Sequence, residues 1–233
     1  MSIYYTIADK NDGFGSQYQG IFSGIALCKA ENYIYVHTPI KILQHGVDVK
    51  KANEFIGIKN NIENYDKNNI IKERFSAKVH WCKTPSIYYT DEVIDYIRNC
   101  YYSTEKPNIG LIDIAIHIRR GDVSKTREVC RYVDNKFYAE VIKKLKVKYP
   151  LYTITIFSEG TYEDFNDLGL EENCFKLNTD VFETFHSLVS SKVLIIGYSS
   201  FSWTAGLINK NIVYHYDSFW HKKLDHWISL SSL

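Results

Sequence analysis

Short segments rich in β-branched and aromatic residues alternate along this chain with segments of helical periodicity. This alternation constrains the fold more than any other feature. Several of the expected strands are apolar on both faces, as strands of a parallel sheet covered by helices are. The pattern predicts an α/β fold. The expected strands are 3–7, 33–37, 78–81, 112–118, 152–157, 193–197 and 212–215.

The segments between these strands have the spacing of amphipathic helices, with apolar residues recurring three or four positions apart. One of them opens with Asp134, a residue type that often caps a helix N-terminus. The expected helices are 17–30, 91–101, 134–149 and a final helix over 218–230.

A polar segment with a proline, residues 103–108, separates one strand–helix pattern from the next and is the best linker candidate in the chain. The 233 residues suffice for two small domains. We therefore expect two Rossmann-like domains, one over 1–105 and the other over 106–233.

Composition and charge exclude several classes of protein. A net charge of +1 gives no basic field for nucleic acid. Five cysteines without a C-x-x-C pair indicate reduced thiols rather than a zinc site. Because no signal peptide and no apolar stretch of membrane-spanning length is visible, we expect a cytoplasmic protein without a transmembrane segment.

The strongest signal for a ligand site follows the strand 112–118. Ligands of open α/β sheets bind beyond the carboxyl ends of the strands. Two arginines offer forked donors for a diphosphate, a glycine permits close backbone approach, and an aspartate can orient an arginine or accept a proton. The alternative is a surface arginine pair beside a turn. The residues are His117, Ile118, Arg119, Arg120, Gly121 and Asp122.

Two further strand ends carry polar residues. After the strand 193–197 come hydroxyl residues that open a helix, where hydroxyl and N–H groups can hold phosphate oxygens. A simple helix cap is the alternative. After the strand 152–157 come a serine and a glutamate. The residues are Ser158, Glu159, Ser199, Ser200, Phe201 and Ser202.

A glycine-rich loop lies between the strand 3–7 and the following helix. It matches neither the dinucleotide fingerprint nor the Walker loop. Its position at a helix N-terminus nevertheless suits an anion, although a structural turn explains it equally well. Its residues of interest are Asp12, Gly13, Phe14, Gly15 and Gln17.

The sequence contains no Asp-x-Asp pair, which transferases that hold a diphosphate through a divalent ion usually need. Arginines and helix N-termini would then neutralise the diphosphate. We therefore expect no metal and no cofactor, and a substrate that carries a diphosphate.

Together these motifs resemble those of the superfamily of α1,2-, α1,6- and protein O-fucosyltransferases. Residues 117–122 resemble its H-x-R-R-x-D motif, and 199–203 resemble the third motif of the α1,2 branch. Residues 157–159 look like the F-S-D of that branch, and 12–17 are similar to its glycine-rich loop. The chain departs from the family at Glu159 and Thr184, where aspartates are usual.

The resemblance implies a GT-B-like fold, with two Rossmann-like domains facing a cleft. It implies an inverting, metal-independent glycosyltransferase, with GDP-fucose the favoured donor. The first domain would then take the acceptor and the second the nucleotide sugar. Arg119 would hold the donor phosphates and stabilise the departing diphosphate. The remaining residues of 117–122, with 158–159 and 199–202, would line the donor, and Gly13 and Gly15 would let the first loop approach it.

Three carboxylates are candidates for the base that deprotonates the acceptor: Glu128, Asp122 and Asp12. Glu128 as an ordinary surface acid is the alternative to the first. Three other functions also fit these motifs. They are transfer from another nucleotide sugar such as UDP-xylose, a non-catalytic nucleotide- or glycan-binding module, and a nucleotide hydrolase.

Overall fold

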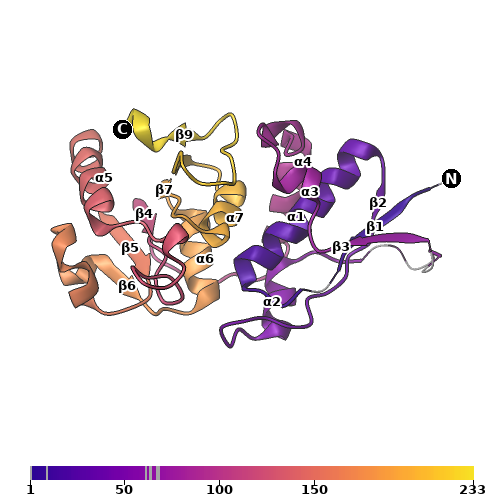
Figure 1. The fold of residues 1–233 in the computed structure, drawn as a ribbon, viewed down its shortest axis with the longest axis horizontal. Helices are drawn as coiled ribbons and strands as arrows, with labels where there is room; N and C mark the ends of the chain where they lie inside the picture. Colours follow the sequence, from indigo (N-terminus) through magenta and orange to yellow (C-terminus); the bar gives the residue numbers. More distant parts are fainter. Residues whose placement is uncertain (1, 9, 61, 63–64, 67–68) are drawn as a thin grey trace. The chain divides into compact units, whose positions relative to one another are not determined.

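The computed structural model of the protein describes residues 2–8, 10–60, 62, 65–66 and 69–233. The chain forms two compact units (Figure 1). The first takes in Met1–Lys106 and Trp220–Asp225, and the second takes in Pro107–Phe219 and His226–Leu233. Within the described part of the chain, no helix is both long enough and apolar enough to cross a membrane.

The first unit is built on β1 (Tyr4–Ile7), the central strand of a parallel sheet. Its neighbours are β2 (Ile34–Tyr35) and β3 (Ile70–Glu73). The helix α1 (Phe14–Glu31) provides the crossover from β1 to β2 that parallel strands require. The other helices of this unit are α2 (Val49–Ile56), α3 (Ala77–His80), η1 (Pro85–Ile87) and α4 (Asp91–Tyr102).

Helix α1 is buried along most of its length because two glycines let it approach the sheet closely. A Cβ atom at Gly24 would lie 2.7 Å from Cγ1 of Ile7. On another side of the helix, the ring of Tyr18 packs 4.2 Å from that of Phe22. The contact between Gly24 and Ile7 packs α1 closely against β1.

The second unit contains a wholly parallel sheet, with six strands among the described residues. The chain begins in the middle with β4, adds β5 and β6 on one side, and then crosses over to add β7, β8 and β9 on the other. This is the strand order of the dinucleotide-binding fold. In spatial order the strands are β6 (Phe175–Leu177), β5 (Ile154–Ser158), β4 (Ile114–His117), β7 (Val193–Ile195), β8 (Ile212–His215) and β9 (Ile228–Ser229).

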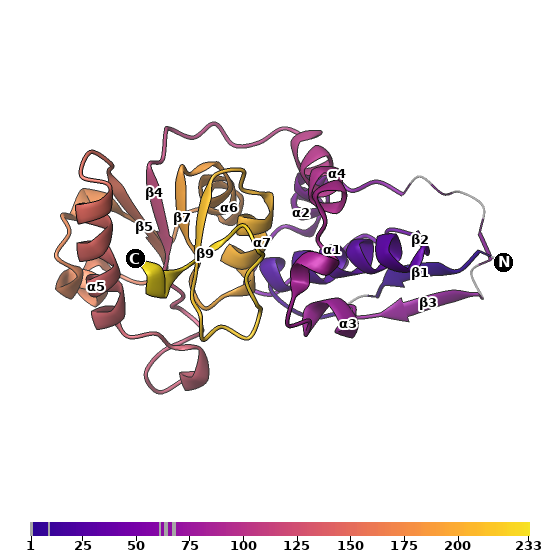
Figure 2. The same ribbon diagram turned by 90° about the horizontal axis from the view of Figure 1, so that it is seen from above.

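Helices cover both faces of this sheet. Figure 2 shows α5 (Asn135–Lys148) on one side of β4, and α6 (Val181–Ser190) and α7 (Ser200–Ile208) on the other. Ile114 and Ile116 share one core cluster with residues of α5. The predicted α/β class with mostly parallel sheets is confirmed. The short 3-10 helices of the unit are η2 (Val129–Arg131), η3 (Tyr162–Leu168), η4 (Glu172–Cys174) and η5 (Leu230–Ser232).

Two expected elements are wrong. The expected strand 78–81 overlaps the single-turn helix α3, because the Ser76 hydroxyl accepts a hydrogen bond from the Val79 N–H and caps that turn. The expected final helix over 218–230 is absent from this described segment, which holds β9 and turns. The apolar residues whose spacing predicted a helix are buried here from turns: Phe219, Leu224 and Trp227 are each buried.

Two glycines of the first unit provide a matched test of packing. Gly57 and Gly46 have nearly the same positive φ, +69° and +67°. A Cβ atom at Gly57 would lie 2.0 Å from the Cys100 carbonyl oxygen, whereas one at Gly46 would meet nothing within 4 Å. We expect Gly46→Ala to cost about 1 kcal/mol, the strain of an L-residue at positive φ. Gly57→Ala should cost at least about 2 kcal/mol more, because the C-terminus of α2 must also move away from α4.

The measurement is the free energy of unfolding from urea denaturation of each variant. Equal losses in the two variants would contradict the close contact between Gly57 and α4.

Candidate functional site

The candidate site lies at the carboxyl end of β4, where the strand order of the second unit reverses. β5 and β7 flank β4 on its two sides, and the chain leaves these two neighbours in opposite directions. Such a reversal opens a crevice between the connections, and ligands of doubly wound sheets bind there. A Cβ atom at Gly197, which follows β7, would lie 2.3 Å from the carbonyl oxygen of His117. Only a glycine therefore fits at this point.

Arg119 and Asp122 form a bidentate ion pair just after the carboxyl end of β4. Nε of Arg119 donates to Oδ1 of Asp122 at 3.2 Å, and Nη2 donates to Oδ2 at 2.6 Å. The two side chains are 21% and 26% exposed. The aspartate fixes the plane of the guanidinium, and Nη1 makes no hydrogen bond to any described residue of the chain. A fixed, partly exposed guanidinium of this kind can bind an anion with its remaining N–H groups.

Arg120 is directed into the unit. Its guanidinium donates to the carbonyl oxygens of Arg119 and Val133 and to Oδ1 of Asn135, at 2.8, 3.0 and 2.5 Å. It also lies 4.4 Å from the ring centroid of Tyr132. Arg120 thus ties the end of β4 to the start of α5. Asn135 is the centre of this network. The sequence analysis did not identify it, and its only signal was its place at the start of the predicted helix.

Gly121 has a φ of +77°, which favours glycine. A Cβ atom there would lie 2.1 Å from Oε2 of Glu159, so that this carboxylate occupies the space above the glycine. The group that approaches Gly121 in the structure is therefore a side chain of the protein. Ser158, beside it, donates its hydroxyl to the carbonyl oxygen of Ile118 at 2.7 Å and links the ends of β5 and β4.

The residues that open α7 lie on the other side of the strand reversal. The Ser199 hydroxyl caps α7 by accepting from the Phe201 N–H at 3.2 Å. The buried Ser202 hydroxyl accepts from the Gly197 N–H at 3.1 Å. Ser199 and Ser202 thus shape the loop from within. Ser200, the first residue of α7, is half-buried, and the ring of Phe201 lies 5.5 Å from that of His117.

His117 is held in its neutral form. Burial and the nearby charge of Arg119 lower the pKa of His117 to about 3. Its Nδ1 atom is buried and has no hydrogen-bond partner among the described residues. A neutral imidazole adds no charge to the site, so Arg119 carries the positive charge at this strand end.

The glycine-rich loop of the first unit is organised by Asp12. Its carboxylate accepts from the Gly13 N–H at 2.8 Å and from the Ser16 hydroxyl at 2.6 Å, and Lys10 lies 3.4 Å away. Although burial alone raises the pKa of Asp12, these Ser16, Lys10 and Gly13 contacts lower it below its usual value. The carboxylate is therefore a weak proton acceptor.

The rest of this loop packs into the first unit. Gln17 donates to the carbonyl oxygens of Asp12 and Ile42. Phe14 is buried, with its ring 6.0 Å from that of Phe55. Gly13 precedes α1 with extended backbone, and Gly15 is a buried residue of its first turn. Every one of these contacts fits the alternative of a structural turn.

Glu128 lies on an exposed loop. Its φ is +50°, and its carboxylate is 3.5 Å from Nε of Arg131. These features fit the surface acid that the sequence left open as an alternative. In the described residues, no group of three or more histidine, cysteine and acidic side chains could hold a metal ion.

No protein-family model and no curated protein matches the chain. Among solved structures, the E. coli heptosyltransferase WaaC with ADP has a TM-score of 0.48 at 12% sequence identity, covering 97% of this chain and 92% of that chain. The α1,6-fucosyltransferase NodZ soaked with GDP-fucose has a TM-score of 0.45 at 11% identity, covering 89% and 93%. At these values neither structure assigns a role to a residue of this chain.

The two arginines should differ sharply in their effect on stability. We expect Arg120→Ala to lose at least about 2 kcal/mol, because it leaves the acceptors on Val133 and Asn135 without their charged donor. Arg119→Ala removes a partly exposed ion pair, which typically contributes about 1 kcal/mol or less. The check is the free energy of unfolding of each variant, and a larger loss for Arg119→Ala would reverse the two assignments.

Proposed function

We propose that the second unit binds the diphosphate of a nucleotide sugar and that the chain is an inverting, metal-independent glycosyltransferase. The observation that carries the proposal is the fixed Arg119–Asp122 pair at the strand reversal. A guanidinium is suited to a diphosphate because its planar N–H groups match two phosphate oxygens. The order of the strands supports the same position for the ligand.

Two groups would hold the donor in this proposal. Arg119 would bind phosphate oxygens through the N–H groups that Asp122 leaves available. The N-terminus of α7, which begins at Ser200, would supply backbone N–H groups and the positive end of the helix dipole. Arg120, Ser199 and Ser202 would contribute indirectly, by fixing the loops that carry these groups.

Arg119 would also act in the chemical step. As the bond between the sugar and the diphosphate breaks, negative charge accumulates on the leaving oxygen. A preorganised guanidinium stabilises that charge more strongly than the charge of the bound donor, which lowers the barrier. No divalent ion is required under this proposal.

The acceptor hydroxyl must lose a proton to a base, and Glu128 fits this role best among the three candidate carboxylates. Both carboxylate oxygens of Asp122 accept hydrogen bonds from Arg119. The pKa of Asp12 is lowered by its contacts with Ser16, Lys10 and Gly13, despite the opposing effect of burial. Glu128 makes one long ion pair with Arg131, so its carboxylate is the most available of the three.

The donor proposed is GDP-fucose, on the resemblance of residues 117–122 and 199–203 to the fucosyltransferase motifs. The alternative is another nucleotide sugar such as UDP-xylose. The proposed role of Arg119 is the same for both, since it concerns only the diphosphate. The first unit would then serve the glycan acceptor.

Removal of Arg119 should greatly slow transfer without unfolding the protein. We expect Arg119→Ala and Arg119→Lys each to lose at least about 100-fold in kcat/KM, the typical effect of removing one preorganised donor. Lysine fails because an ammonium cannot reproduce the fork. The assay follows donor-dependent transfer to an added glycan acceptor, beside a melting curve for each variant.

Arg127→Ala is the matched control, since Arg127 is an exposed arginine of the loop that follows β4. It should keep normal transfer. A folded Arg119→Ala variant with normal transfer would show that the site lies elsewhere.

The preferred nucleotide can be identified by thermal stabilisation in buffer containing EDTA. A ligand at about 100 times its dissociation constant adds about 2.7 kcal/mol to stability. We expect GDP to raise the melting temperature more than UDP or ADP does, with no loss on chelation. Stronger stabilisation by UDP would move the assignment to a UDP-sugar, and dependence on a divalent ion would contradict the metal-independent mechanism.

A further inference from the structure

The amino-terminal edge of the six-stranded sheet exposes three large apolar side chains, which we call the apolar tip. Val147 is 83%, Leu151 92% and Leu111 77% exposed. β4 and β5 pair in parallel with Ile114 opposite Ile154, and Leu111 and Leu151 each lie three residues before that pair. Val147 lies in the last turn of α5, whose chain then leads directly into β5. The three side chains therefore belong to one end of the unit.

Lysines surround this tip. Residues 143–152 contain four lysines and no acidic residue. A fifth, Lys192, precedes β7 and has its Nζ 5.0 Å from the ring centroid of Tyr152. Two of the five have acidic partners: Lys143 pairs with Glu140 at 2.7 Å, and Lys192 with Asp113 at 2.8 Å. We call this group the lysine rim; it consists of Lys143, Lys144, Lys146, Lys148 and Lys192.

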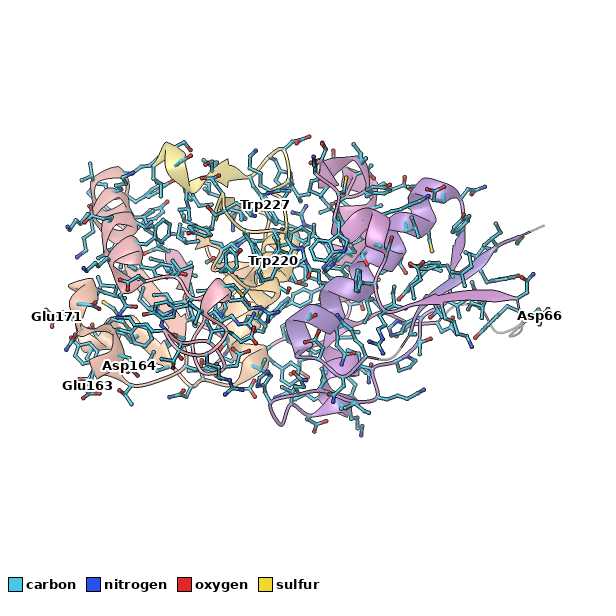
Figure 3. The ribbon with its side chains drawn as sticks, in the orientation of Figure 1. Asp66, Glu163, Asp164, Glu171, Trp220 and Trp227 are labelled. Atoms are coloured by element: carbon cyan, nitrogen blue, oxygen red, sulfur yellow. The ribbon has the colours of Figure 1, made fainter. Side chains whose placement is uncertain are left out.

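Five acidic side chains of the unit lie on a neighbouring segment, 163–172, where Lys146 donates to the carbonyl oxygen of Gly169 at 3.4 Å. Figure 3 shows Glu163, Asp164 and Glu171 on η3 and the chain leading to η4, below α5 in that view. The last turns of α5 thus present positive charge with only Glu140 opposing it on the same helix. Apolar side chains that protrude together from a surface mark an interaction site more often than single exposed residues do.

We propose that the apolar tip and the lysine rim dock this protein onto an anionic lipid membrane. Apolar side chains that project from the surface can enter the boundary between headgroups and acyl chains, and lysines around them attract acidic headgroups. The long lysine stems suit this position, since they cover apolar surface while the ammonium stays in water. A protein partner fits less well, because lysine is depleted at protein interfaces.

The docking surface and the candidate site lie at opposite ends of the same strands. Arg119 follows the carboxyl end of β4, whereas Leu111 precedes its amino end. A molecule docked by the apolar tip would therefore keep Arg119 away from the lipid. This inference is independent of the proposed function, because it uses none of the residues assigned to the donor site.

The test is co-sedimentation of the full chain with phosphatidylcholine vesicles, with and without phosphatidylglycerol. We expect binding only to the vesicles with phosphatidylglycerol. The double variant Lys144→Gln with Lys146→Gln should lower the partition coefficient about 30-fold, since each lysine near an anionic surface contributes about a factor of five. Leu151→Asn should lower it at least about fivefold, through loss of the inserted apolar side chain.

The controls remove equivalent groups from the exposed surface of the first unit. Lys50→Gln with Lys51→Gln, on α2, changes the net charge equally, and Ile87→Asn replaces an apolar residue that is 60% exposed. Both should bind vesicles like the unaltered protein. Equal loss of binding in the controls, or no binding to anionic vesicles, overturns the proposal. Binding to soluble polyglutamate without binding to vesicles also overturns it and assigns the surface to an acidic protein.

Discussion

The parallel pairing of β4 with both β5 and β7 is the constraint on which the second unit depends. Ile114 and Ile116 pair with β5 on one side and with β7 on the other, so one strand aligns the carboxyl ends of all three. The chain continues from these ends into α5, the segment leading to η3, and α7. The positions of Arg119, Glu159 and Ser199 follow from this single register.

Most polar side chains at the carboxyl edge of the sheet form hydrogen bonds within the protein. Arg120 binds the start of α5, Ser158 binds the end of β4, and Ser202 binds the Gly197 N–H. Each satisfies a group whose burial without a partner would cost free energy. Arg119 differs because Asp122 orients it without using all its donors. The internal contacts therefore make the loops rigid enough to hold one guanidinium in place.

The two ends of this sheet have different surface chemistry. The carboxyl end gathers arginine, hydroxyl and backbone N–H groups that suit a small anion. The amino end carries the exposed side chains of Val147 and Leu151 and a group of lysines. Parallel strands create this polarity, because every strand presents the same end to the same edge and each edge receives only one kind of connection.

The sequence by itself determined the α/β class and the strand that precedes Arg119. Both predictions rest on the spacing of apolar residues over a few neighbouring positions, which can be read from the sequence without the fold. It also marked Asp134 as the cap of α5, and the side chain does cap that helix. It failed at 78–81, where a serine cap forms a helical turn, and at 218–230, where apolar residues with helical spacing are buried from turns.

Only the tertiary structure decided which polar side chains bond to the protein itself and which can bind a ligand. Arg119 and Arg120 are adjacent and chemically identical, and the alternation along the chain after β4 turns one toward Asp122 and the other toward Asn135. Likewise, nothing in the spacing of Gly121 and Glu159 shows that the carboxylate fills the space above the glycine. Gly121 and Glu159 are 38 positions apart in the sequence, so their approach exists only once the register between β4 and β5 is set.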